Sequence, residues 1–223
     1  IFYFIDPTLQ VHVEINEGEE VTAGSIAITV SGKARSILRA ERLALNCMQR
    51  MSGIATMTRQ VVKKLEDLPT KVLDTRKTTP GIRFLEKLAV RIGGGVNHRF
   101  GLYDMMMIKD NHIDYAGGIE QAIRLADEYR NNHQLNIKLE IEARNLDEVE
   151  QILEVGLVDR IMLDNFSFDH LREAVSRIPD GIETEASGGI NLETVRSFAE
   201  CGVDYVSMGA LTHSARSLDI SLK

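Results

Sequence analysis

Apolar positions from residue 71 onward fall into clusters that alternate between two spacings. Short runs rich in Val, Ile, Leu and Met predict buried strands, and segments with an apolar residue every three or four positions predict helices. The predicted strands cover 71–75, 104–109, 136–143, 159–164, 182–186 and 203–208, and the predicted helices cover 80–92, 116–130, 146–155, 168–178 and 191–201. This alternation indicates a parallel sheet with helical crossovers.

The first 68 residues have a different pattern. Residues 10–32 alternate apolar and polar positions around a turn, which predicts two strands. Residues 36–66 have helical periodicity, and Gly53 either breaks this helix or packs closely. Ile1 begins inside an apolar and aromatic run, so we expect a further segment upstream.

The fold class that we expect is α/β. It is an open or incomplete (β/α) barrel of six to seven parallel strands, preceded by a partial α+β N-terminal domain. Six strands are visible, and the glycine-dense stretch 93–100 could hide a seventh. We place a partial α/β sandwich over 1–68 and the barrel over 69–223, whose C-terminal end could return to the first domain.

Polar residues recur after the predicted strands, and in a barrel these strand ends share one rim. Cations follow the first two strands, carboxylates end the middle two, and glycine-rich loops follow the last two. The residues are Asp74–Lys77, Lys109–His112, Glu140, Glu142, Asp164, Asn165, Glu185, Ser187–Gly189 and Gly209. The rim is therefore the candidate site.

Composition describes a water-soluble globular chain, with 43% hydrophobic and 26% charged residues and no apolar run long enough to span a membrane. The net charge of −7 disfavours nucleic acid as a partner. Yet residues 71–112 hold eight Lys/Arg against four Asp/Glu, which favours a small anionic ligand. Arg83, Lys87 and Arg91 are explained by a charged helix surface, and Arg76, Lys77 and Lys109 are explained less well. The two cysteines have no metal or redox spacing, and we expect reduced thiols in a cytoplasmic protein.

The loops Ser187–Asn191 and Ser207–Ala210 carry glycines between a strand and a helix. Such loops let backbone N–H groups approach phosphate oxygens, and barrels favour phosphate sites after their last strands. The alternative is a pair of tight turns that simply need glycine.

Glu140 and Glu142 lie two apart on one strand, so both side chains share a face, and Asp164 ends the next strand. Carboxylates this close favour Mg²⁺ or sugar hydroxyls as ligands. The alternative is a structural ion pair with Lys77 or Lys109. The adjacent His98 and Arg99 are candidates for carboxylate recognition, although a lone histidine is more often a satisfied polar residue. No activated nucleophile is evident, so the pattern favours displacement at an electrophile held by charge.

Long motifs from about Arg39 onward make the chain resemble the quinolinate phosphoribosyltransferase (decarboxylating) family, also called nicotinate-nucleotide pyrophosphorylase. These motifs are Glu41–Asn46, Ser52–Thr56, Asp74–Gly81, Gly94–Arg99, Asp104–His112, Leu163–Phe166, Glu185–Ile190 and Ser207–Gly209. The resemblance implies a pentosyltransferase of NAD biosynthesis. Its reaction joins quinolinate to phosphoribosyl pyrophosphate and gives nicotinate mononucleotide, pyrophosphate and CO₂.

The resemblance also implies residue roles. The quinolinate site would comprise Arg76, His98, Arg99 and Lys109, with Arg42 from the neighbouring subunit of a homodimer or a higher oligomer. The phosphoribosyl pyrophosphate site would comprise Lys77, Lys109, Glu142, Asp164, Ser187, Gly188, Gly189, Gly209 and His213. Magnesium would be held by Glu142 and Asp164, with Glu140 a weaker candidate, and the catalytic residues would be Lys109, Glu142 and Asp164.

Two alternatives remain open at this point. One is another phosphoribosyl-type enzyme with the same barrel and a different acceptor. The other is a related protein that binds a small oxyanion, such as those linked to molybdate transport. The joint presence of Arg76, His98, Arg99 and Lys109 argues against the second, because an oxyanion needs no dicarboxylate clamp.

Overall fold

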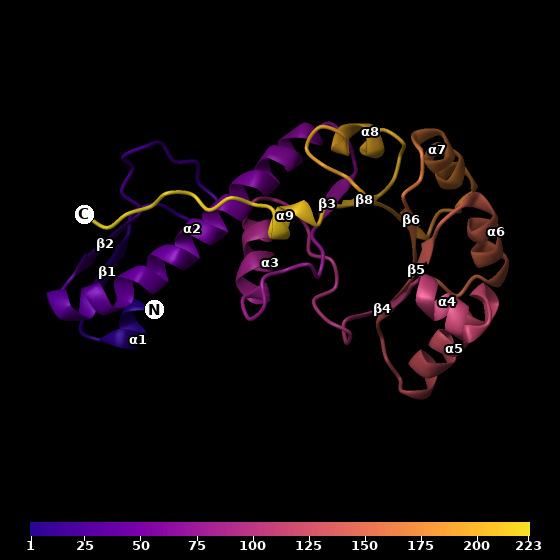
Figure 1. Cartoon of the computed structure of the whole chain (residues 1–223), viewed down its shortest axis with the longest axis horizontal. Coiled ribbons are helices and arrows are strands. Elements are labelled where there is room, and N and C mark those ends of the chain that lie inside the picture. The colour runs from indigo at the N-terminus through magenta and orange to yellow at the C-terminus, as the bar shows by residue number, and fades with distance from the viewer.

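The computed structural model describes all residues, 1–223. Its N-terminal part contains a small antiparallel sheet and one long helix (Figure 1). The elements are α1 (Phe2–Ile5), β1 (Gln10–Val13), β2 (Ile28–Ser31) and α2 (Ala34–Lys64). The two predicted strands are confirmed, although both are short and the segment between them is mostly exposed.

The second part is built on a six-stranded parallel sheet in the order β3-β8-β7-β6-β5-β4. Its strands are β3 (Lys71–Leu73), β4 (Met105–Ile108), β5 (Lys138–Ala143), β6 (Arg160–Asp164), β7 (Glu183–Ser187) and β8 (Tyr205–Ser207). A single parallel bridge joins Leu73 to Val96, so the glycine-dense stretch adds one residue of a seventh strand. The predicted incomplete barrel is confirmed.

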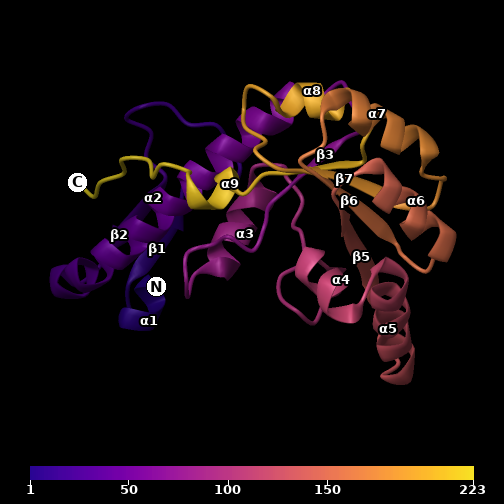
Figure 2. The ribbon, with the colours of Figure 1, turned by 45° about the vertical axis from the view of Figure 1, so that its right-hand side comes forward.

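Helices cover the outer, convex side of the curved sheet, and Figure 2 shows the same arrangement after a 45° turn. On the convex side lie α5 (Ile119–Asn132), α6 (Leu146–Val155), α7 (Phe168–Arg177) and α8 (Val195–Ala199), and α4 (Asp110–Ala116) leads into α5. The helices α3 (Arg83–Ile92) and α9 (Ala210–His213) instead pack against α2. The prediction of a single helix over 116–130 is wrong at its start, because α4 ends at Ala116 and α5 begins at Ile119. Gly117 and Gly118 have φ of +89° and +139°, a conformation that ends α4 before α5 begins.

Strand alternation separates an apolar outer face from a polar inner face. Ile141 of β5, Leu163 of β6 and Ala186 of β7 point outward and join the main hydrophobic core beneath the helices. Glu140 and Glu185 occupy the alternate positions and are also fully buried. The inner face of the sheet therefore encloses charge, and those charges need partners.

The C-terminal residues run back along α2, as both ribbon views show. The backbone N–H of Leu218 donates to the carbonyl of Gln49 at 3.1 Å, and the Gln49 amide donates to the carbonyl of Ile220 at 2.8 Å. The helix α2 continues through Gly53 without a break. The absence of a side chain at Gly53 leaves room for the backbone at Arg216 to pack against the helix. No helix of the structure is both long and apolar enough to cross a membrane.

Candidate active site

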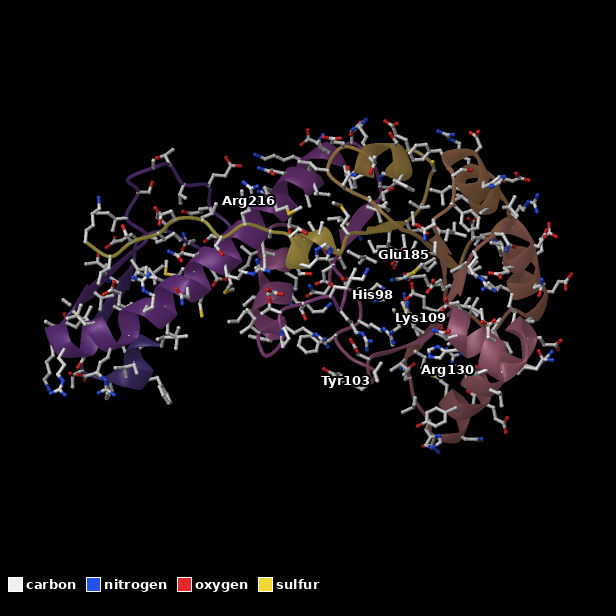
Figure 3. All side chains as sticks on the ribbon, in the orientation of Figure 1. His98, Tyr103, Lys109, Arg130, Glu185 and Arg216 are labelled. Carbon is white, nitrogen blue, oxygen red and sulfur yellow. The ribbon has the colours of Figure 1, made fainter.

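The carboxyl ends of the parallel strands meet around one opening, which we call the rim. We define the rim by five residues at these strand ends. Arg76 and Lys77 follow β3, Lys109 follows β4, and Glu142 and Asp164 lie at the ends of β5 and β6. Figure 3 shows Lys109, His98 and Glu185 on the inner side of the curved sheet. Residues that are far apart in the sequence thus surround one concave space.

The loop after β3 presents two exposed cations on a fixed backbone. The Thr212 hydroxyl donates to the Lys77 carbonyl at 2.8 Å, and the buried Glu86 carboxylate accepts from the Thr79 N–H at 2.9 Å. The side chains of Arg76 and Lys77 form no hydrogen bond or ion pair of their own. The fold therefore holds the loop and leaves both charges for a ligand.

Arg99 lies deeper and also lacks an anionic partner. Its side chain makes only long contacts, 3.5 Å to the Met105 carbonyl and 3.4 Å to the Met107 sulfur, although the residue is only 9% exposed. Burial, together with the positive charge of Arg76, lowers the pKa of Arg99. Neither guanidinium group forms an ion pair, so the two together make a site that favours an anion.

A buried ion pair anchors the loop that carries Arg99. The Lys87 ammonium donates to Asp74 at 2.5 Å and to the His98 carbonyl at 2.9 Å. Asp74 also accepts from the Asn97 amide at 2.6 Å and from the His98 N–H at 2.9 Å. The expectation that Lys87 belongs to a charged helix surface is wrong, because it is 2% exposed and pairs inward.

His98 points into the barrel rather than standing free at the rim. Its Nε2 lies 3.1 Å from a carboxylate oxygen of Glu140 and 3.4 Å from one of Glu185, and the Arg160 guanidinium donates to Glu185 at 3.2 Å. We call these four residues the buried cluster. Burial acts to lower the pKa of His98, but the two adjacent carboxylates outweigh it and raise the pKa to about 9. The cluster therefore holds an imidazolium whose charge is already met.

The two acidic residues of β5 have different surroundings although they share a face. Glu140 is fully enclosed beside His98, and its pKa is raised by burial and by Glu185. Glu142 reaches the rim, where Lys109 donates to it at 3.0 Å. Asp164, at the end of β6, accepts only from the neighbouring Asn165 amide at 2.6 Å. The carboxylates that reach the rim are thus Glu142, which is mostly enclosed, and Asp164.

The glycine loops bring the last two strand ends against their neighbours. A side chain on Gly188, which has φ of +104°, would meet the Asn165 amide oxygen at 2.2 Å. A Cβ atom added to Gly209 would lie 3.1 Å from the His213 ring and 3.3 Å from the aliphatic part of the Lys77 side chain. Gly189, with φ of +61°, faces open space. Lys77, Gly209 and His213 therefore lie together, as an anion site with backbone donors requires.

Arg42 stands apart from the other candidates. It lies in the N-terminal half of α2, which projects away from the barrel (Figure 1). Arg50, two turns further along, already contacts α3 through Glu86 at 2.8 Å and α9 through the Thr212 carbonyl. The structure therefore does not bring Arg42 into the site of its own chain.

Sequence reasoning gave no role to Arg160, and it left Asp74 and Glu185 as polar strand ends without partners. A signal existed for Glu185. It lies two residues from both Glu183 and Ser187, so these side chains share the inner face, as Glu140 and Glu142 do. Arg160, the first residue of β6, lies four residues before Asp164, so both side chains are on the inner face. Their pairing depends on strand neighbours that only the sheet order supplies.

Comparisons with known proteins agree along the whole chain. The family model for the quinolinate phosphoribosyl transferase C-terminal domain matches residues 54–223, and the model for its N-terminal domain matches residues 1–52. Quinolinate phosphoribosyltransferase [decarboxylating] 1b of Nicotiana tabacum is 47% identical over 237 residues, which covers 100% of this chain and 67% of the relative.

A bacterial relative and a solved structure give the same picture. The probable nicotinate-nucleotide pyrophosphorylase [carboxylating] of Bacillus subtilis (strain 168) is 47% identical over 221 residues, covering 99% of this chain and 75% of the relative. The crystal structure of NadC from Streptococcus pyogenes aligns with a TM-score of 0.92 and 42% identity, covering 100% of this chain and 77% of that one.

Proposed function

The chain belongs to the quinolinate phosphoribosyltransferase family, and from this premise we propose that it transfers the phosphoribosyl group of phosphoribosyl pyrophosphate to quinolinate. The products are nicotinate mononucleotide, pyrophosphate and CO₂, a step of NAD biosynthesis. The observation that carries this proposal is the Arg76 and Arg99 pair, two neighbouring guanidinium groups without a carboxylate partner.

Quinolinate fits these cations because it carries two adjacent carboxylates on a flat ring. Arg99 binds from inside the barrel, Arg76 binds from the loop after β3, and Lys109 lies across the rim on the β4 side. Guanidinium groups bind carboxylates in a fixed plane, so this clamp orients the ring as well as holding it. His98 has a supporting role in this proposal, because its charge is met by Glu140 and Glu185.

Phosphoribosyl pyrophosphate fits the opposite side of the rim. Lys77 and His213 meet over Gly209, and Gly188 and Gly189 open a second loop after Ser187. Backbone N–H groups of such loops, with the lysine, hold phosphate oxygens. The loop after β3 carries both Arg76 and Lys77, so the two substrates would meet beside it.

Magnesium enters the proposal through Glu142 and Asp164. Glu142 and Asp164 fit a hard cation, because both offer carboxylate oxygens at the rim. Glu142 already binds a positive charge there, the ammonium of Lys109. When bound, Mg²⁺ would supply positive charge to the pyrophosphate group. The enclosed Glu140 is the less suitable ligand.

The reaction follows from how these residues position the substrates. The ring nitrogen of quinolinate forms a bond to the anomeric carbon of the ribose as the bond to pyrophosphate breaks. Glu142 and Asp164 bind the ribose hydroxyls and stabilise the positive charge that develops on the sugar, while Lys77 stabilises the departing anion. The pyridinium ring then accepts the electron pair released when the 2-carboxylate leaves as CO₂, and that carbon takes up a proton.

A homodimer, or a higher oligomer built from it, completes the proposal. Arg42 lies on α2 away from its own barrel, so it would contribute to the site of a neighbouring subunit. A cytoplasmic location remains a prediction, and the plant relatives include proteins named as mitochondrial and chloroplastic.

The direct test is an assay of the full-length protein with quinolinate, phosphoribosyl pyrophosphate and Mg²⁺. Nicotinate mononucleotide and CO₂ should form in equal amounts. Nicotinate in place of quinolinate should give no CO₂ and little product, because it lacks the second carboxylate. Failure to form product, combined with tight binding of molybdate, would favour the oxyanion-binding alternative.

A further inference from the structure

Lys109 and Glu142 hold each other in the free protein, although each belongs to a different substrate in the proposed reaction. They follow the paired residues Ile108 of β4 and Ile141 of β5, so the strand register sets them side by side. The Lys109 ammonium lies 3.0 Å from the Glu142 carboxylate, and neither side chain forms another ion pair.

The surroundings of the pair decide what its separation costs. The Glu142 side chain is 13% exposed, whereas that of Lys109 is 45% exposed. Lys109 can turn toward solvent or toward a ligand at little cost. Glu142 is mostly enclosed, so loss of the ammonium would leave its carboxylate with too little water and no cation.

We propose that the Lys109–Glu142 ion pair couples the two substrates by an exchange of partners, an inference that rests on the proposed function. A dicarboxylate that takes Lys109 leaves Glu142 without its cation. Mg²⁺ bound with phosphoribosyl pyrophosphate gives Glu142 a new cation and releases Lys109. Each substrate therefore favours binding of the other, and the two effects are equal by linkage.

This exchange makes an unusual prediction about a site residue. Glu142→Gln removes the carboxylate that holds Lys109 back, so quinolinate alone should bind this variant about three- to tenfold more tightly than it binds the wild type. The measurement is isothermal titration of the full-length protein with quinolinate, in the absence of Mg²⁺ and phosphoribosyl pyrophosphate. Lys109→Met combined with Glu142→Gln should abolish this gain.

Asp164→Asn is the matched control. It also removes one negative charge from the rim, but Asp164 pairs with no cation. If the exchange is correct, quinolinate affinity should change by less than about twofold in this variant. An equal gain in Asp164→Asn would show only a general field effect and would overturn the exchange.

A second measurement tests the coupling itself. Phthalate has the two carboxylates of quinolinate but no ring nitrogen, so it cannot react. Saturating phthalate should tighten binding of phosphoribosyl pyrophosphate with Mg²⁺ to the wild type about three- to tenfold, and this effect should disappear in Lys109→Met.

The outcomes separate this inference from the proposed function. If the wild type binds no quinolinate, the proposed function fails. If the wild type binds quinolinate and Glu142→Gln binds it equally or more weakly, the function stands and the exchange is wrong. Circular dichroism of each variant would establish that its fold is intact.

Discussion

The buried cluster and the rim both contain acidic and basic side chains, and they differ in whether those charges are paired with opposite charges inside the protein. In the cluster, His98 lies between Glu140 and Glu185, and Arg160 pairs with Glu185 and Glu183. At the rim, Arg76, Lys77 and Asp164 have no ion-pair partner, and Lys109 has one that is partly exposed. Charges met inside the protein support the fold, whereas charges left open are available to ligands.

The difference teaches that residue type alone does not identify a ligand-binding residue. Lys87 and Lys77 are ten residues apart in one basic stretch, yet one is enclosed by Asp74 and the other is exposed. Their chemistry is the same, and the loop that folds over Lys87 makes the distinction. Four predictions test this division, from the largest expected effect to the smallest.

The largest effect should come from breaking a buried pair. Lys87→Met leaves the Asp74 carboxylate enclosed without a cation, so the free energy of unfolding should fall by about 3–5 kcal/mol. Urea unfolding measures the change. The rim variant Arg76→Met should lie within about 0.5 kcal/mol of the wild type, because it removes no internal pair. Equal losses in both variants would contradict the division.

The pH dependence of stability should report on the buried cluster. The two carboxylates beside His98 raise its pKa from 6.5 to about 9 in the folded protein, so folding favours the imidazolium. That stabilisation is complete below about pH 6.5 and is lost as the pH rises through 9, a fall of roughly 3 kcal/mol. Urea unfolding at a series of pH values measures it, and His98→Gln should lack this part of the slope. A wild-type stability that rises over this range would contradict the assignment.

At the rim the effect should fall on activity instead. Arg76→Ala should lower kcat/KM for quinolinate about a hundredfold, because the clamp loses one charged contact. Thermal unfolding should be nearly unchanged, and KM for phosphoribosyl pyrophosphate should change far less. Arg91→Ala, an exposed arginine of α3 outside the rim, is the matched control. Unchanged kinetics in Arg76→Ala would exclude the proposed clamp.

The smallest signal should come from mixed subunits. Arg42→Ala and Arg76→Ala proteins should each be nearly inactive, and mixed dimers contain one site with both arginines intact. Random exchange should restore up to about a quarter of the wild-type activity. Mass spectrometry would establish that mixed dimers form, and if they form without activity, Arg42 does not act across subunits.

Much of the fold was predictable because it depends on local periodicity. The alternating strands and helices from residue 71, the small N-terminal sheet and the family resemblance are all confirmed. The start of the helical connection from β4 to β5 was missed, because Asp110–His112 were interpreted as polar strand-end residues and they also begin α4. The domain boundary at 68/69 and the individual site roles stay predictions.

The sequence by itself determined where strands end and which chemistry gathers there, because the carboxyl ends of parallel strands share one edge whatever their order. Only the tertiary structure decided which charges are already satisfied. Asp74 with Lys87, His98 with Glu185, and Lys109 with Glu142 are pairs separated by 13 to 87 residues along the chain. The free energy of a charge depends on its burial and its nearest opposite charge, and both are set by contacts between distant segments.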